Sequence, residues 1–266
     1  MELQGRFDEI RKTGMGLASI TYDPVAVLAD FATRRNIAFP ILSDSGSATI
    51  KKYGILNTTV PTSNQLFGYP FPGTFMLNRD GVVTARFFEE TYQERDTISS
   101  VLVRLGGKVN APATKTSAPH LEITSYLTDQ VAAPGTHFSI VLDLVPANRV
   151  HVYAPGVTGY KPIALTVHPQ VGLVVRNAQF PKAEDYFFKP LNEHVPVYQR
   201  PFRVVQDVML DPGRDAAAAL REMKTMTIAA TLSYQACDDK LCFVPQSVPL
   251  SWTINVRPLD VERPKR

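Results

Sequence analysis

Over the first 105 residues, segments with the apolar spacing of a helix alternate with segments that have the apolar pattern of a strand. Leu3, Phe7 and Ile10 are spaced as on one face of an amphipathic helix, whereas Met15–Tyr22 has the length and composition of a buried strand. Expected helices span residues 2–13, 24–35, 47–53 and 96–105, and expected strands span 15–22, 39–42, 74–78 and 82–88. Such alternation predicts an α/β domain built on a central sheet.

Local start and stop signals support these boundaries. Asp23 and Pro24 supply an N-cap and a first helical residue for the second helix, and Gly54 ends the third. The tripeptide Arg79-Asp80-Gly81 is a strong turn signal between the last two strands, which predicts a hairpin.

The pattern changes after residue 105. Residues 106–119 are poor in large apolar side chains and rich in Gly, Ala, Thr, Ser and Pro, which predicts an interdomain linker. Short strand patterns follow at residues 138–145, 150–153, 163–167, 173–175, 202–210, 227–234 and 248–256, with one Ala-rich helix at 215–226. We therefore expect an α/β domain over 1–105, a linker over 106–119, an all-β sandwich over 120–257 and a tail over 258–266.

Composition narrows the function classes. The 266 residues carry a formal net charge of +3 without a dense Lys/Arg patch, so a nucleic-acid partner is not expected. No run approaches the ~18 apolar residues that span a bilayer, and the helical pattern at the start is not that of a signal peptide. The five histidines are scattered singly and nucleotide-binding glycine motifs are absent, so neither a metal nor a cofactor is predicted.

Both cysteines lie in one short segment, Tyr234-Gln-Ala-Cys237-Asp-Asp-Lys-Leu-Cys242-Phe-Val-Pro245. Strand patterns flank it, and a tight connection between antiparallel strands can bring two Cα atoms within the ~4.4–6.8 Å of a disulfide. A covalent loop this small gains little from loop closure compared with one that ties distant segments together. The spacing therefore indicates a redox-active pair, with a structural disulfide, and two free thiols or a metal half-site, as the open alternatives.

Neighbouring charges bear on how such a pair reacts. Exchange needs a thiolate and an accessible sulfur. Asp238 and Asp239 would raise the pKa of a nearby thiol, whereas Lys240 would lower it. Two acidic neighbours argue for a sulfur that receives electrons from a more reactive partner thiol, and thus for a relay.

Several side chains are candidates for the surroundings of the pair. Those that could shield a disulfide, or equally pack within the sandwich, are Tyr153, Tyr160, Tyr234 and Phe243. His151 is interpreted as a packed or surface residue of a strand, with a proton shuttle as the alternative because an imidazole titrates near neutrality. Glu193 and His194 are interpreted as loop residues and not as a catalytic dyad.

Four segments of the first domain follow a recognisable order and spacing: Gly16–Asp23, Phe39–Asp44, Ile50–Gly54 and Pro72–Gly81. Over about residues 1–105 they resemble the peroxiredoxin family, the thioredoxin-like alkyl hydroperoxide reductase/thiol-specific antioxidant (AhpC/TSA) group. The resemblance implies a thioredoxin-like fold and a cis peptide bond before Pro72, at the border of the redox site.

The first domain departs from that family in one respect. Family members carry the reactive cysteine in the loop before the helix that residues 2–13 would form, and residues 1–105 contain no cysteine. A peroxidatic reaction needs a thiolate. We therefore expect a domain incomplete at its N-terminus, without its first strand and catalytic cysteine. The alternative is a relic that binds and does not react.

Four segments of the second domain also form a recognisable set: His151–Gly156, Tyr160–Ile163, Asn192–Tyr198 and the Cys237/Cys242 segment. Over about residues 121–256 they resemble the N-terminal, extracytoplasmic domain of DsbD thiol:disulfide interchange proteins, an immunoglobulin-like sandwich. The resemblance implies that Cys237 and Cys242 cycle between dithiol and disulfide. It also implies a redox partner, either a thioredoxin-like protein or a membrane electron donor, and an extracytoplasmic or periplasmic location.

The sequence thus favours a thiol–disulfide oxidoreductase or electron relay in which Cys237 and Cys242 react. Expected lining residues of the redox site are Pro72, Tyr153, Tyr234 and Phe243. Two alternatives stay open. One is a non-catalytic binding or scaffold protein with a structural disulfide, and the other is a peroxidase whose reactive cysteine lies upstream of Met1.

Overall fold

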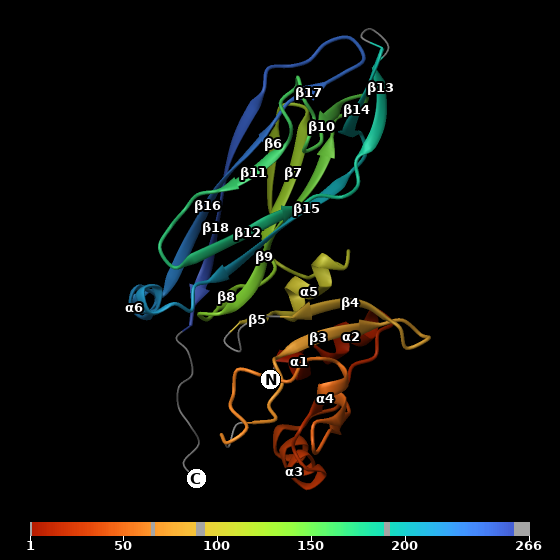
Figure 1. Ribbon diagram of the computed structural model, residues 1–266. Coiled ribbons are helices and arrows are strands. Elements are labelled where there is room, and N and C mark those ends of the chain that lie inside the picture. Colours follow the sequence, from red (N-terminus) through yellow and green to blue (C-terminus); the bar gives the residue numbers. More distant parts are fainter. Residues whose placement is uncertain (1, 65–66, 89–93, 189–191, 258–266) are drawn as a thin grey trace. The chain divides into compact units, whose positions relative to one another are not determined.

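The computed structural model describes residues 2–64, 67–88, 94–188 and 192–257 (Figure 1). The chain divides into two compact units, Met1–Ile98 and Ser99–Arg266, here called the first and second units. The expected tail, residues 258–266, lies outside the described residues. Within the described part of the chain, no helix has the length and apolarity needed to cross a membrane.

The first unit alternates short helices and strands. Its elements are α1 (Glu2–Gly5), α2 (Phe7–Lys12), β1 (Ser19–Thr21), α3 (Val25–Arg35), β2 (Ile41–Ser43), α4 (Ala48–Lys52), β3 (Gly73–Leu77), β4 (Val83–Phe88) and β5 (Arg95–Asp96). β1 and β2 pair in parallel, and β3 and β4 pair antiparallel in a separate sheet. The sequence predicts one central sheet for these strands. Its pattern identifies the strands but not their partners, which depend on contacts between distant segments.

The hairpin expected around Arg79-Asp80-Gly81 is confirmed. Asn78 Oδ1 accepts hydrogen bonds from the backbone N–H groups of Asp80 and Val82, at 3.0 and 2.9 Å. Gly81 has φ +77°, a left-handed conformation that glycine adopts without steric cost. Local turn chemistry therefore sets this connection.

The peptide bond before Pro72 corrects an expectation. The resemblance implies a cis bond, whereas no peptide bond among the described residues is cis. A trans bond before proline is favoured by about 0.5–1 kcal/mol, and only specific tertiary contacts reverse that preference. Pro72 itself is half-buried, immediately before β3.

The second unit is mostly β-strand. Its elements are α5 (from Ile98 to Arg104), β6 (Thr114–Ala118), β7 (Leu121–Leu127), β8 (Val131–Ala132), β9 (Thr136–Pro146), β10 (His151–Tyr153), β11 (Ala164–Val167), β12 (Leu173–Gln179), β13 (Glu184–Phe188), β14 (Glu193–Tyr198), β15 (Phe202–Leu210), α6 (Arg214–Glu222), β16 (Thr225–Tyr234), β17 (Ala236–Cys237) and β18 (Gln246–Val256). Every strand expected from residue 138 onward has a counterpart here, with ends shifted by a few residues.

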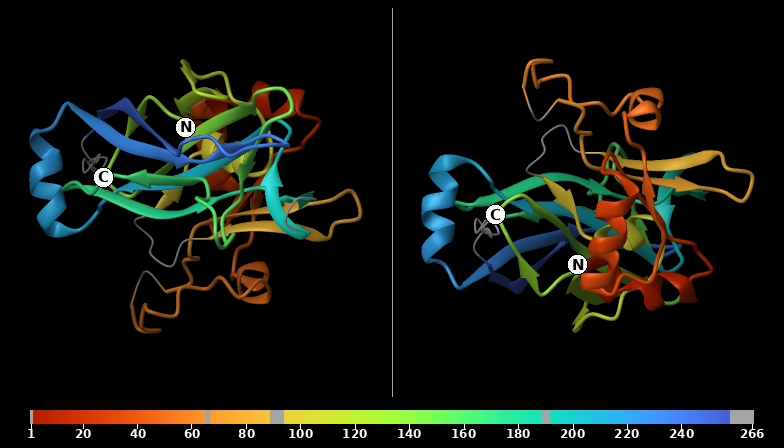
Figure 2. Two further views of the ribbon diagram at one scale, coloured as in Figure 1. Left: turned by 90° about the horizontal axis from the view of Figure 1, so that it is seen from above. Right: turned by 90° about the horizontal axis from the view of Figure 1, so that it is seen from below.

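Three sheets organise these strands. Their orders are β12-β15-β9-β7-β6, β11-β16-β18-β8 and β13-β14-β10-β17. The first two share one core, because Ile140 of β9 packs in the same buried cluster as Ile228 of β16 and Trp252 of β18. Figure 2 shows the β16–β18 hairpin and the β12–β15 pair in separate layers. We call this cluster the main core.

The segment expected as a linker contains regular structure. β6 lies within residues 106–119 and pairs antiparallel with β7, from Thr114↔Ser125 to Ala118↔Leu121. Most of its side chains are polar and exposed. The composition of this strand therefore resembles that of a linker. Just before this segment, Val103 of α5 is buried against Tyr126 and Val205, so α5 from Ser99 onward belongs to the second unit.

Candidate redox-active disulfide

The two cysteines lie in the connection between β16 and β18. These strands pair antiparallel as far as Tyr234↔Gln246, and residues 235–245 join them. Within that connection, β17 leaves the hairpin and pairs with β10 of another sheet. Cys237 and Cys242 form a disulfide with their Cα atoms 4.0 Å apart. The pair is therefore oxidised, and neither sulfur is a free thiol or a metal ligand in this state.

A hydrogen-bonded turn closes the loop independently of the disulfide. Asp238 Oδ1 accepts hydrogen bonds from the backbone N–H groups of Lys240 and Leu241, at 2.8 and 2.9 Å. The backbone N–H of Asp238 donates to Leu241 O, and that of Phe243 donates to Ala236 O. Donation by Leu241 N–H, and next by Lys240 N–H, holds the pKa of Asp238 below its usual value. An Asp at the start of a tight turn is the residue type that favours this geometry.

The two sulfur-bearing residues differ in exposure. Cys237 is 1% exposed and packs in a small cluster with Tyr153, Val195 and Val197, here called the cysteine cluster. Cys242 is exposed. Leu241 precedes it and is 52% exposed. A protein partner can therefore approach Cys242 far more readily than Cys237.

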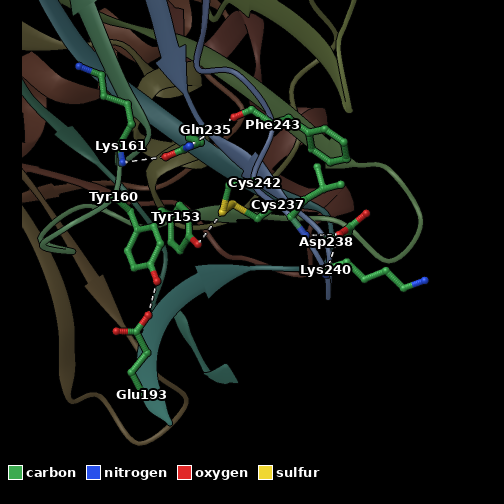
Figure 3. The surroundings of a disulfide bond; sticks show 11 residues. Tyr153, Tyr160, Lys161, Glu193, Gln235, Cys237, Asp238, Lys240, Cys242 and Phe243 are labelled. Carbon is green, nitrogen blue, oxygen red and sulfur yellow. Dashed lines mark hydrogen bonds between the residues drawn. A yellow bond between two sulfur atoms is a disulfide. The ribbon is translucent and has the colours of Figure 1, made fainter. Parts of the chain in front are cut away.

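Two stacked tyrosines flank the exposed cysteine (Figure 3). The rings of Tyr153 and Tyr160 lie 4.2 Å apart between centroids with a 20° angle between their planes. The Tyr153 hydroxyl lies 3.4 Å from Cys242 Sγ, and it donates because a disulfide sulfur carries no proton. The Tyr160 hydroxyl donates to Glu193 Oε1. Burial, and next the neighbouring Tyr160, raise the pKa of Tyr153 well above its ordinary value, so its hydroxyl stays protonated.

Gln235 ties the disulfide loop to the segment after β10. Its Oε1 accepts a hydrogen bond from the backbone N–H of Lys161 at 3.1 Å, and its Nε2 donates to Phe243 O at 3.3 Å. Because Lys161 follows Tyr160 directly, this bridge fixes the tyrosine pair relative to the cysteines. The amide of Gln235 is thus a structural support for the site.

His151 is buried at the same end of the sheet. It is 3% exposed and opposite Cys237 in the β10–β17 register. Its ring lies 5.4 Å from that of Tyr153 and 4.5 Å from that of Tyr186, between centroids. Burial lowers the pKa of His151, and Asp239 and Asp238 oppose that effect. The imidazole is therefore neutral at neutral pH.

Of the expected lining residues in the second unit, Tyr153 reaches the disulfide, whereas the side chains of Tyr234 and Phe243 pack elsewhere. Tyr234 is fully buried in the main core, where its hydroxyl donates to Pro119 O at 2.6 Å. Phe243 stacks on His120, with 3.7 Å between ring centroids, and packs against the main core. Pro72 belongs to the first unit.

Sequence reasoning missed Tyr186 of β13. Its hydroxyl donates to Asp239 Oδ1 at 2.9 Å, and its ring packs against the cysteine cluster. Nothing local signals this role, since Tyr186 lies 51 residues before Cys237 in the chain and reaches the cluster only through the β13–β14–β10 pairing. Glu193 and His194, interpreted as loop residues, lie in β14, where His194 Nδ1 lies 2.7 Å from Asp185 Oδ2.

Comparisons with known proteins bear on both parts of the chain. Residues 1–86 match the model of the AhpC/TSA family, and no curated protein sequence matches the chain. The solved structures to which it is similar include the following three. The N-terminal domain of DsbD from Neisseria meningitidis, in the reduced form, is 15% identical, with a TM-score of 0.31 over 44% of this chain and 78% of that one.

The other two are the N-terminal periplasmic domain of ScsB from Proteus mirabilis and the SrpA adhesin from Streptococcus sanguinis. ScsB is 12% identical with a TM-score of 0.37, covering 55% of this chain and 52% of that one. SrpA is 17% identical with a TM-score of 0.26, covering 57% and 59%. TM-scores this low fix neither fold nor function. The N-terminal part of the chain resembles the AhpC/TSA family, as its sequence indicates, and a DsbD N-terminal domain is among the structures to which the chain is similar.

Proposed function

We propose that this protein is a thiol–disulfide oxidoreductase that relays electrons through Cys237 and Cys242. Its redox partner is a protein with a reactive dithiol, either thioredoxin-like or membrane-bound. The observation that carries the proposal is the contrast between an exposed Cys242 and a Cys237 that is 1% exposed. A disulfide that only stabilises a fold has no need of one approachable sulfur.

The exposure contrast assigns an order to the exchange steps. A partner thiolate attacks Cys242 Sγ, the intramolecular S–S bond breaks, and Cys237 leaves as a thiolate that takes up a proton. A second partner thiolate then attacks the partner's own sulfur in the mixed disulfide, and Cys242 leaves. Two electrons and two protons reach the cysteine pair, and the partner becomes oxidised. Donation to a client disulfide follows the reverse order.

Two further observations support the proposal. The match of residues 1–86 is to a family of thiol-dependent redox proteins, although the first unit contains no cysteine and cannot itself supply a thiolate. A disulfide forms and persists in an oxidising compartment, so we place the protein outside the cytoplasm. The immunoglobulin-like sandwich expected over residues 120–257 belongs to the same proposal, as a rigid support for the exchange loop.

The deciding experiment is a redox titration of the Cys237–Cys242 couple. The protein is equilibrated in graded thiol/disulfide buffers, alkylated, and weighed by mass spectrometry. A reduction potential of about −250 mV or higher supports the relay. A value below about −300 mV identifies a structural disulfide and moves the assignment to a binding or scaffold protein.

Single cysteine variants test the assigned order. Cys237→Ser keeps the exposed thiol and is expected to accumulate a mixed disulfide at Cys242 without completing exchange. Cys242→Ser keeps only the buried thiol. It is expected to react much more slowly than Cys237→Ser when both are given the same small-molecule disulfide. If the two variants react at equal rates, the order is wrong.

A further inference from the structure

His151 and Cys237 are direct partners in the β10–β17 ladder. Their pairing is antiparallel, with Val152↔Ala236 as the adjacent pair. Directly opposite residues place their side chains on the same face, with Cβ atoms about 4.5–5.5 Å apart. Val152 and Ala236 face the main core. His151 and Cys237 therefore face the other side together, where the cysteine cluster lies.

Both partners are shielded from water. His151 is 3% exposed and Cys237 is 1% exposed. Burial among apolar side chains raises the pKa of a thiol, because the thiolate loses its hydration. Burial therefore disfavours the thiolate of a reduced Cys237, and bulk water cannot readily take its proton.

We propose that His151 is the general base for Cys237 when the intramolecular disulfide re-forms. The inference rests on the proposed function, in which a client disulfide is held as a mixed disulfide on Cys242. His151 takes the proton from the Cys237 thiol, and the resulting thiolate attacks Cys242 Sγ. The Cys237–Cys242 bond forms, the Cys242–client bond breaks, and the client sulfur leaves as a thiolate with the electron pair. The imidazolium then returns its proton to solvent or to that leaving thiolate.

The surroundings of His151 suit this role. Burial lowers its pKa, so the imidazole is unprotonated and able to accept a proton at neutral pH. The charged groups that act on it, Asp239 and Asp238, lie in the loop after β17 and favour the imidazolium once it forms. β14 contributes Val195 and Val197 to the cluster, and its Glu193 accepts a hydrogen bond from the Tyr160 hydroxyl beside it.

Two tyrosine rings also lie against the imidazole. They are Tyr153 on β10 itself and Tyr186 on β13. Burial is the largest cause of the raised pKa of each, so neither hydroxyl titrates near neutrality. A pH dependence of disulfide closure between about pH 5 and 7 therefore reports on the imidazole.

The test follows disulfide closure directly by stopped flow. The reduced full-length protein is mixed with 5,5′-dithiobis(2-nitrobenzoate), which releases one thionitrobenzoate when Cys242 reacts and a second when Cys237 displaces it. In the parent, the rate of the second release is expected to rise to a plateau with a midpoint below pH 6.5, the ordinary imidazole value. In His151→Gln, it is expected to fall by about a hundredfold at pH 7 and to keep rising toward pH 8.5 and above, as for an unassisted thiol.

A matched histidine serves as the control. His168 lies in the segment after β11, in another sheet, and its Nε2 lies 2.9 Å from Thr231 Oγ1. His168→Gln is expected to keep both the parental rate and the parental pH profile. If His151→Gln does not fold, the parental profile decides alone, and a rate that rises without a plateau up to pH 9 overturns the inference.

The two releases separate this inference from the proposed function. If both thionitrobenzoate releases in His151→Gln are as fast as in the parent, only the role of His151 is overturned. If dithiol buffers leave the Cys237–Cys242 disulfide oxidised, the proposed function itself is wrong.

Discussion

At the scale of single residues, the Tyr153 hydroxyl is the contact that most directly tunes the exposed sulfur. It donates to Cys242 Sγ in the disulfide, and the same donor is in place to stabilise a Cys242 thiolate after reduction. A hydrogen bond to a charged acceptor contributes about 1.5–3 kcal/mol, more than one to a neutral sulfur. We therefore expect the hydroxyl to favour the Cys242 thiolate over the thiol in the reduced protein.

Tyr153→Phe should consequently slow the reaction of reduced Cys242. We expect alkylation by iodoacetamide at pH 7 to be about three- to tenfold slower, since the loss of thiolate is partly offset by its greater nucleophilicity. Tyr198→Phe is the control, because the Tyr198 hydroxyl donates to Pro181 O and not to a sulfur. Equal alkylation rates in Tyr153→Phe and the parent would contradict the assigned contact.

The residue scale also shows where sequence reasoning succeeds and fails. The proximity of Cys237 and Cys242 could be predicted, because five positions of separation leave the chain little freedom. Tyr234 precedes the pair closely in sequence, yet strand alternation turns its side chain into the main core. Tyr186 reaches the cysteine cluster from a distant strand, and no local pattern encodes that pairing.

At the scale of elements, β16 shows how strand alternation builds the second unit. Buried and exposed positions alternate along it, with Ile228 and Leu232 fully buried and Thr227 exposed. The same strand runs directly into the disulfide loop. Packing of β16 thus fixes the position from which that loop starts.

Leu232→Ala is expected to destabilise the second unit by about 2–5 kcal/mol, through lost burial and an unfilled cavity. Trp252, the single tryptophan of the chain, is buried in the main core and reports on this unit alone in denaturant titrations. The exposed Thr227→Ala is the control and should change the free energy of unfolding by less than about 0.5 kcal/mol. Similar effects of both variants would contradict the alternation of buried and exposed positions along β16.

The turn formed by Asp238 gives a prediction with a defined pH window. Asp238→Asn weakens the turn hydrogen bonds, and it affects the dithiol more than the disulfide, which holds the loop covalently. The variant should therefore have a lower reduction potential than the parent. Because the pKa of folded Asp238 lies below its ordinary 3.8, the stabilisation is fully present above that pH and is lost as the pH falls further.

Redox titrations at pH 7 and pH 3 test this window. The difference between parent and Asp238→Asn is expected at pH 7 and should shrink at pH 3, where the parental carboxylate begins to protonate. A difference that persists unchanged at both values would rule out the carboxylate as its cause.

Elements with strong local signals were predicted well. The β3–β4 hairpin has its own turn chemistry. α3 begins at Val25 near the predicted position, but its N-cap is Pro24 and not Asp23, and no side chain caps it. β6 and β13 lacked such signals, because both strands are short and neither has a regular alternation of polar and apolar residues. They form strands through pairing with β7 and β14. The sequence therefore predicted the class of each region better than its sheet partners.

At the scale of the whole molecule, any thiol chemistry belongs to the second unit. Both cysteines lie there, and the first unit contains none. The covalent loop is short, with a sequence separation of 5, so its closure restricts the unfolded chain only modestly. Reduction should leave the fold intact.

We expect reduction to lower the free energy of unfolding of the second unit by about 2 kcal/mol or less. Amide hydrogen exchange measured before and after reduction should change around residues 235–245 and remain unchanged over residues 2–64. Global loss of protection in the reduced protein would identify the disulfide as a structural bond.

The shortness of the loop between the cysteines also governs how the reduced protein withstands oxidants. Peroxide converts an accessible thiolate to a sulfenic acid, and further peroxide makes that damage irreversible. Cys237 lies five positions away, so its sulfur can condense with a sulfenic acid on Cys242, release water and restore the disulfide. The buried cysteine thereby acts as an internal safeguard, and oxidative injury at the exposed position ends in the ordinary resting state of the protein.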